Sequence, residues 1–336
     1  MVRRWARVVL GVGLAALFVG LLVRRVDAEQ VRRVLAGAAA TPLLLGLLAL
    51  GADMTARIAR WWYMLRAVEP DLPFGACARP FLASLALNNT LPFRAGDVAR
   101  VVGFRRTLRA PAAHVAGTLV LERVLDLLTL LAILFASLAG GPGHFPRAFL
   151  VAGALVGVAA LAALLALTFA GGALARLMDH RLARRFAGRT WLPAVRRIMD
   201  QLSGALALLR SRGMAARLVA LSLLAWGLEG AVFACAAWSL GLAMPWPAPW
   251  LSLASATLAT LLPSTPGYVG TFDYFATLGL TAWGVAASGA AAFAVLTHFL
   301  LWAPVTAAGL LALVVGRARD RAPSLDSLRR GEGMPA

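Results

Sequence analysis

An apolar segment in the first third of the chain runs into Asn88-Asn89-Thr90-Leu91-Pro92-Phe93-Arg94-Ala95-Gly96-Asp97-Val98-Ala99-Arg100, which we call the first break. The second break lies far downstream and reads Leu262-Pro263-Ser264-Thr265-Pro266-Gly267-Tyr268-Val269-Gly270-Thr271-Phe272-Asp273. Each break follows an apolar run and contains Leu-Pro, then glycine, then an acidic residue. Such interruptions expose backbone N–H and C=O groups whose hydrogen bonds lipid cannot satisfy. They therefore occur only inside protein or beside a water-filled cavity. Two of them, one in each half of a chain, indicate the binding site of a transporter.

The composition is that of a membrane protein. The chain is 60% hydrophobic and 14% charged, and its mean hydropathy is +0.78. Soluble chains are only about 45–50% apolar, and several stretches here reach the roughly 20 residues that cross a bilayer core. We therefore predict an all-α fold, a polytopic helical bundle in which two broken or re-entrant helices form an inverted repeat.

Apolar runs separated by charged loops predict where the chain crosses the membrane. The expected full spans are 5–23, 41–56, 113–138, 148–170, 218–240, 268–287 and 290–315. We expect a re-entrant hairpin or broken helix at 74–92 and a half-length helix at 249–262. Residues 57–66 alternate arginine with aromatic residues, which is typical of an anchor at the lipid headgroups.

The predicted domains are a transmembrane domain over 1–316 and a basic disordered tail over 317–336. Within the first, residues 171–217 form a cytoplasmic segment, and its apolar residues between 195 and 209 recur at the spacing of an amphipathic surface helix. Arginine-rich loops favour a cytoplasmic position for both termini.

The net charge of +18 comes entirely from arginine, because the sequence contains no lysine. The arginines gather in loops between apolar spans, where they set topology and meet anionic headgroups, so we expect no nucleic-acid partner. Cys77 and Cys235 lie in apolar segments and support neither a disulfide framework nor a metal site. The sequence also has no P-loop, His/Cys ligand cluster or Gly-x-Ser-x-Gly elbow, so we expect no cofactor and no enzyme.

Charged residues inside a membrane are costly and are therefore candidates for function. Glu122 and Asp126 share one face of the predicted 113–138 helix, with Arg123 beside them. They form either an internal ion-pair network, with Arg94 or Arg79 as partner, or a site for a substrate headgroup. Arg94 lies in the first break, where its guanidinium can hold a phosphate in a bidentate fork.

The remaining polar residues of the breaks and spans have two interpretations each. Asp97 either caps the following helix or pairs with Arg94 or Arg100. Asp273 is a candidate partner for Arg123 across the two halves. Glu229 and His298 are expected to make hydrogen bonds between helices rather than contact a substrate. The candidate substrate-binding residues are Arg94, Arg123, Asn89, Gly96, Gly267 and Gly270, and the candidate charge network or proton relay is Asp97, Arg100, Glu122, Asp126 and Asp273.

Three motifs in order resemble a known family. They are Asn89-x-x-Pro92-x-Arg94-x-Gly96-Asp97-x-x-Arg100, Glu122-Arg123-x-x-Asp126 and Pro263-x-x-Pro266-Gly267-x-x-Gly270-x-x-Asp273. Together, over about 5–315, they look like the flippase-like membrane family, also called the lysylphosphatidylglycerol synthase transmembrane region family. Asp97 and Asp273 stand where that family often has Glu.

The resemblance implies a membrane domain that moves lipids. Relatives fuse this domain to a cytoplasmic aminoacyl-transferase domain and carry the modified lipid across the bilayer. We expect no such synthase domain here, because the sequence ends soon after its last span. Other relatives are associated with glycolipids, polyprenyl-linked sugars or hopanoids, so the resemblance leaves the lipid open.

The leading hypothesis is a transporter or flippase of the bacterial inner membrane that moves an anionic or phosphate-bearing lipid, with a polyprenyl or glycolipid headgroup as a further option. One alternative is an intramembrane lipid-modifying enzyme that uses Asp or Glu as a general base. Another is a non-catalytic partner that anchors a lipid-synthesis complex through 171–217.

Overall fold

The computed structural model describes residues 2–24, 26–91, 94–139, 207–262 and 265–321, together with positions 151, 155, 157–159, 162 and 204. Every regular element in these ranges is helical, which confirms the all-α fold class. The elements are α1 (Val2–Val23), α2 (Ala28–Ala36), α3 (Ala40–Leu65), α4 (Phe74–Thr90), α5 (Ala95–Val102), α6 (Arg105–Leu108), α7 (Ala112–Ala139), η2 (Ala207–Arg210), α10 (Arg212–Ser239), α11 (Pro247–Ala259), η3 (Pro266–Tyr268), α12 (Thr271–Thr281) and α13 (Ala287–Arg321).

Three helices, α3, α10 and α13, are long and apolar enough to cross a membrane. At 1.5 Å per residue the 26 residues of α3 extend about 39 Å, more than the ~30 Å of a bilayer core. The chain is therefore a multi-pass membrane protein. Helix α7 has a similar length of 28 residues but carries charged residues in its middle.

Helix α3 corrects one prediction. The span expected at 41–56 and the headgroup anchor expected at 57–66 are a single continuous helix. Arg57 and Arg60 are buried in the bundle rather than exposed at the lipid surface. The two arginines are stabilised in the interior because they face α7 and α10, which supply carboxylates.

The first break reverses the chain. Helix α4 ends at Thr90, and the short α5 packs back against α4. Gly96 makes this contact feasible, because a Cβ at that position would overlap the Ser84 carbonyl oxygen of α4. Residues 74–102 thus form a helical hairpin.

The second break also reverses the chain, and here the span predicted at 268–287 is wrong. Helix α11 has 13 residues and α12 has 11, so they extend only about 20 Å and 17 Å and pack against each other. Gly267 and Gly270 have φ angles of 71° and 83°, a left-handed region that glycine adopts without strain, and they allow the reversal between these helices.

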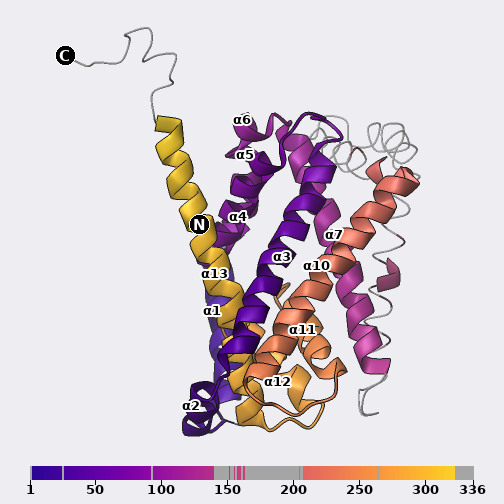
Figure 1. The fold of residues 1–336 in the computed structure, drawn as a ribbon. Helices are drawn as coiled ribbons and strands as arrows, with labels where there is room; N and C mark the ends of the chain where they lie inside the picture. Colours follow the sequence, from indigo (N-terminus) through magenta and orange to yellow (C-terminus); the bar gives the residue numbers. More distant parts are fainter. Residues whose placement is uncertain are drawn as a thin grey trace, which may run out of the picture.

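The two hairpins lie at opposite ends of the bundle. Figure 1 shows α5 and α6 at the upper end and α11 and α12 at the lower end, with α3, α7, α10 and α13 running the length of the molecule. The breaks meet inside, since a Cβ built on Gly267 would lie 3.5 Å from the Asn89 carbonyl oxygen. Re-entry into a membrane and the inverted repeat remain predictions.

The two largest of four apolar clusters hold most of the described helices together. One surrounds Phe233 of α10, whose ring lies 6.2 Å from that of Phe272 and 5.9 Å from that of Phe293. The other surrounds the fully buried Trp61 and includes Phe81 of α4. The predicted span at 148–170, most of the surface helix at 195–209 and the tail beyond 321 lie outside the described residues.

Candidate functional site

The first buried cluster of charge joins α3 to α10. Asp53 and Arg57 are four residues apart on α3, and the Arg57 Nε donates to Asp53 Oδ1 over 2.7 Å. The Arg57 Nη2 reaches Glu229 of α10, and the guanidinium also lies 4.3 Å above the Trp226 ring. This cation is therefore shared by two carboxylates and an aromatic face, which is how a buried guanidinium avoids an uncompensated charge.

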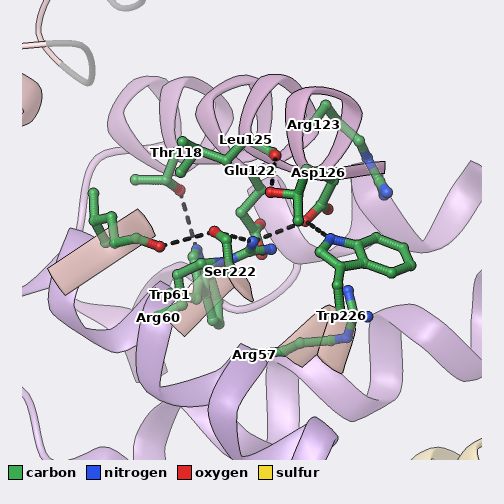
Figure 2. Close-up of polar contacts among 12 residues, drawn as sticks. Arg57, Arg60, Trp61, Thr118, Glu122, Arg123, Leu125, Asp126, Ser222 and Trp226 are labelled. Atoms are coloured by element: carbon green, nitrogen blue, oxygen red, sulfur yellow. Dashed lines mark hydrogen bonds and ion pairs between the residues drawn. The ribbon is translucent and has the colours of Figure 1, made fainter. Parts of the chain in front are cut away.

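The second cluster joins α3 to α7. The Arg60 Nη1 donates to Asp126 Oδ1 and to Ser222 Oγ, each over 2.8 Å, and the Trp226 Nε1 donates to the same Asp126 oxygen over 3.1 Å. Figure 2 shows these donors converging on Asp126, while the Arg123 side chain extends away from the cluster. Three helices are thus locked together by one carboxylate.

The third cluster joins α5 to α7. The Arg100 Nη2 donates to Glu122 Oε2, and the Arg100 guanidinium lies 4.5 Å from the Trp61 ring centroid. Glu122 also lies 3.8 Å from Arg60. The internal ion-pair interpretation of Glu122 and Asp126 therefore has structural support, but their partners are Arg60 and Arg100 rather than Arg94 or Arg79.

Asp97 joins the two sides of the first break. It accepts a hydrogen bond from Asn88 Nδ2 over 2.9 Å and lies 3.2 Å from the Arg123 Nη2. Its ion-pair partner is Arg123, whereas Arg94 and Arg100 act on it only at longer range; the N-cap residue of α5 is Arg94, which makes no side-chain cap hydrogen bond. The first break is thus tied to α7 through Arg123.

Asp273 lies in the second break and pairs with His298 of α13, not with Arg123. Its Oδ1 lies 2.8 Å from His298 Nδ1, and its Oδ2 accepts from the Gly270 N–H over 2.9 Å. The His298 Nε2 lies 2.8 Å from the Gly267 carbonyl oxygen. Glu229 and His298 therefore make the interhelical contacts predicted from the sequence.

A cavity of about 230 Å³ lies where the two breaks meet, and we call it the central cavity. Its polar and charged lining comes from α3, the first break, α7, α10, α11, the second break and α13. These residues are Arg57, Asn88, Asn89, Arg94, Arg123, Glu229, Thr257, Thr260, Tyr268, His298 and Trp302, joined by Gly267.

The three arginines at the central cavity differ in their ion-pair partners. Arg57 is paired with both Asp53 and Glu229, and Arg123 is paired with Asp97. Arg94 is in no ion pair with any residue that the structure describes; its guanidinium lies 6.0 Å from the Tyr268 ring centroid. Its backbone is left-handed, with φ 52° and ψ 43°, a conformation that costs a non-glycine residue about 1–2 kcal/mol. Strain of this kind is concentrated at functional sites.

Of the other candidate residues, two line the central cavity and two support the packing of neighbouring helices. Asn89 lines the central cavity, and its Nδ2 donates to Thr306 Oγ1 of α13 over 2.9 Å. Gly267 lines it as well. Gly96 and Gly270 are outside the lining as described, and each meets a neighbouring helix: Gly96 packs on α4, while a Cβ at Gly270 would lie 2.7 Å from the Ala15 carbonyl oxygen of α1.

Sequence reasoning missed the contribution of α3. The sequence places Asp53 near the end of the predicted span 41–56, and Arg57 and Arg60 in the predicted headgroup anchor 57–66. The spacing of Asp53 and Arg57, four residues apart in a helix, is the signal that could have found them, because it is typical of an ion pair on one helical face.

The fold and the site define a class: a multi-pass membrane protein whose two helical hairpins meet at a cavity lined by an arginine, Arg94, that is in no ion pair with the described residues. The chain belongs to the lysylphosphatidylglycerol synthase TM region family, which it matches over residues 8–309. This confirms the resemblance seen in the sequence, and membership in this flippase-like family is consistent with a role connected to membrane lipids. No curated protein sequence matches the chain.

Proposed function

We propose that this protein is a lipid transporter of the bacterial inner membrane that moves an anionic or phosphate-bearing lipid between leaflets. The observation that carries the proposal is Arg94, a cation in no ion pair with any described residue and with Asp97 acting on it only at longer range, placed at the cavity where two helix breaks meet. A guanidinium presents two parallel N–H donors that match two oxygens of a phosphate.

The size of the central cavity supports a headgroup as the bound part. Pockets that enclose a whole drug-sized ligand measure about 300–1,000 Å³, and this one measures about 230 Å³. A headgroup fits such a volume and two acyl chains do not, so the chains stay in the bilayer while the headgroup crosses through protein.

The sidedness follows from the arginines of the described loops. The end of the bundle that carries α6 holds Arg105, Arg106 and Arg109, and the start of α10 adds Arg212 and Arg217. Because positive loops stay in the cytoplasm, the α4–α5 hairpin opens toward the cytoplasm and the α11–α12 hairpin toward the opposite side.

The carboxylates favour transport over lipid modification. A general base must be within reach of the proton that it removes, but Glu122, Asp126 and Glu229 are each held by an arginine. An anchor for a synthesis complex would in turn not need Arg94 at the central cavity without an ion pair among the described residues.

The test is lipid translocation in liposomes, with a fluorescent anionic phospholipid, a fluorescent zwitterionic phospholipid and an impermeant quencher. Wild type is compared with Arg94→Ala, Arg94→Lys and the control Arg32→Ala on the exposed α2 helix. Loss of a hydrogen bond to a charged group is worth about 1.5–3 kcal/mol, so Arg94→Ala is expected to slow the anionic lipid roughly 10- to 100-fold.

The outcomes separate the alternatives. Arg94→Lys should retain charge but lose the fork, giving an intermediate rate, and Arg32→Ala should match wild type. Equal rates for wild type and Arg94→Ala would show that Arg94 does not hold the headgroup. A wild type no faster than protein-free liposomes with either lipid would reject phospholipid transport, and a new lipid species in the mass spectrum would favour the enzyme.

A further inference from the structure

His298 has an oxygen acceptor at each of its two ring nitrogens. Nδ1 lies 2.8 Å from Asp273 Oδ1, and Nε2 lies 2.8 Å from the Gly267 carbonyl oxygen. Both distances are those of good hydrogen bonds. A backbone carbonyl can only accept, so the Nε2 must carry a hydrogen.

The hydrogens of this arrangement can be counted. A neutral imidazole has one N–H, and in this geometry it is the one that points at Gly267. The contact between Nδ1 and Asp273 needs a second hydrogen, carried either by Nδ1 or by the Asp273 carboxyl oxygen. In both forms the His298–Asp273 pair is electrically neutral and holds one proton more than a neutral histidine beside a carboxylate.

The surroundings favour this neutral form. The charged groups that share the central cavity with His298 are Arg57 of α3, Arg94 at the first break, Arg123 of α7 and Glu229 of α10. Arg57 is paired with Asp53 and Glu229, and Arg123 with Asp97, so that these three carboxylates balance the three arginines and no net charge is left for the His298–Asp273 pair to neutralise. The side chains of His298 and Asp273 are 16% and 12% exposed, and a largely buried pair avoids the desolvation cost of a net charge when it retains its proton.

We propose that His298 and Asp273 form a proton-binding site that closes the second break onto α13, and that opening of the break releases the proton. The proton site itself is independent of the function proposed above. Its consequence, that lipid movement is coupled to protons, rests on that function.

Loss of the proton breaks a specific contact. The remaining N–H forms the stronger, charge-assisted bond with the Asp273 carboxylate. Nε2 then presents a lone pair to the Gly267 carbonyl oxygen, and the two repel. Gly267, which has the left-handed φ of 71°, is thereby freed from α13.

Release of Gly267 directly changes the lining of the central cavity, the proposed substrate site. Gly267 lines the central cavity, and a Cβ on it would lie 3.0 Å from Trp302 Nε1 and 3.5 Å from the Asn89 carbonyl oxygen of the first break. The protonation state of His298–Asp273 therefore changes the wall against which a headgroup binds.

Asp273→Asn removes the carboxyl group that shares the proton but keeps the hydrogen bonds of the second break. The amide oxygen can accept from the Gly270 N–H, and the amide N–H can donate to the Nδ1 of a neutral His298 whose Nε2–H still bonds Gly267. This variant reproduces the proton-loaded contacts without a carboxyl group. His298→Phe is its counterpart, because it keeps the ring that packs 4.8 Å from Phe272 but removes both hydrogen bonds.

The experiment is hydrogen–deuterium exchange of the full chain in lipid nanodiscs, followed in peptides that cover 265–273 and corrected for the intrinsic pH dependence of exchange. Between about pH 5 and about pH 9 the wild-type second break is expected to lose protection roughly tenfold or more. Asp273→Asn should stay protected throughout, and His298→Phe should be unprotected throughout.

Wild-type protection that does not change with pH, or Asp273→Asn that loses protection as wild type does, would overturn the proton site. A liposome assay tests the coupling separately: a pH gradient should change the wild-type translocation rate but not that of Asp273→Asn. If exchange responds to pH and the gradient has no effect on translocation, the proton site stands and the coupling is wrong.

Discussion

Arg60 of α3 and Asp126 of α7 are 66 residues apart in sequence and are joined by a 2.8 Å ion pair inside the bundle. Arg60 is only 1% exposed, and Ser222 and Trp226 of α10 complete the contact. Taking both charges out of water is costly, and their attraction repays the cost only with good geometry and further hydrogen bonds. The pair therefore specifies how three helices meet more than it adds to stability.

Removing one charge of this pair should lower the stability of the protein severely, whereas removing both charges should not. Arg60→Met leaves an uncompensated buried carboxylate and is expected to lower the free energy of unfolding by about 3–5 kcal/mol. Arg60→Met with Asp126→Leu removes both charges and should recover much of that loss. Circular dichroism during a titration with sodium dodecyl sulfate measures the differences.

The control for this double-variant cycle is Arg32→Ala, which breaks the exposed Arg32–Glu29 pair of α2 and should leave the midpoint of unfolding almost unchanged. A double variant that is less stable than Arg60→Met alone would show that the ion pair itself, rather than the orphaned carboxylate, accounts for the loss.

Trp226 has two roles that one substitution can separate. Its ring lies under Arg57, and its Nε1 donates to Asp126. Trp226→Phe retains an aromatic face for Arg57 but removes the donor, so we expect a loss of about 1–3 kcal/mol. The same unfolding assay measures it, with the exposed Trp238→Phe as control. Equal stability of the two variants would argue that water satisfies Asp126.

The architecture could be predicted from the sequence because its signals are local. Leu91-Pro92 and Leu262-Pro263, each followed by glycine, mark both reversals, and apolar length marks α10 and α13. The length of α12 was overestimated because residues beyond Thr281 are as apolar as a span, and composition alone does not show a turn.

The partners of the charged residues could not be predicted, because they depend on which helices become neighbours. Asp273 and Arg123 looked complementary in sequence, yet Asp273 meets His298 and Arg123 meets Asp97. Arg57 and Arg60 resembled a headgroup anchor, since arginine next to tryptophan occurs both at an interface and in a core. Only the packing of α3 against α7 and α10 distinguishes the two.

Gly96 should tolerate no side chain. A Cβ there would overlap the Ser84 carbonyl oxygen, so Gly96→Ala must push α5 away from α4 and with it Asp97 and Arg100. We expect a loss of about 1–3 kcal/mol, the usual cost of overpacking. Gly51→Ala is the matched control, because its Cβ meets nothing within 4 Å and a helical alanine gains about 0.5–1 kcal/mol. If both variants gain stability, α5 is not packed as closely as the structure shows.

Substitutions of Arg94 should affect stability and lipid translocation differently. Its left-handed backbone is strained for any residue with a Cβ but not for glycine, which adopts φ 52° freely. After the entropy cost of glycine, Arg94→Gly is expected to be about 0.5–1 kcal/mol more stable than Arg94→Ala. Both variants lack the guanidinium, so both should translocate the anionic lipid equally slowly. Unfolding and translocation measured on the same preparations test this together. If Arg94→Gly and Arg94→Ala unfold at the same midpoint, the backbone at the first break is not held in the left-handed conformation, and Arg94 enters the central cavity without strain.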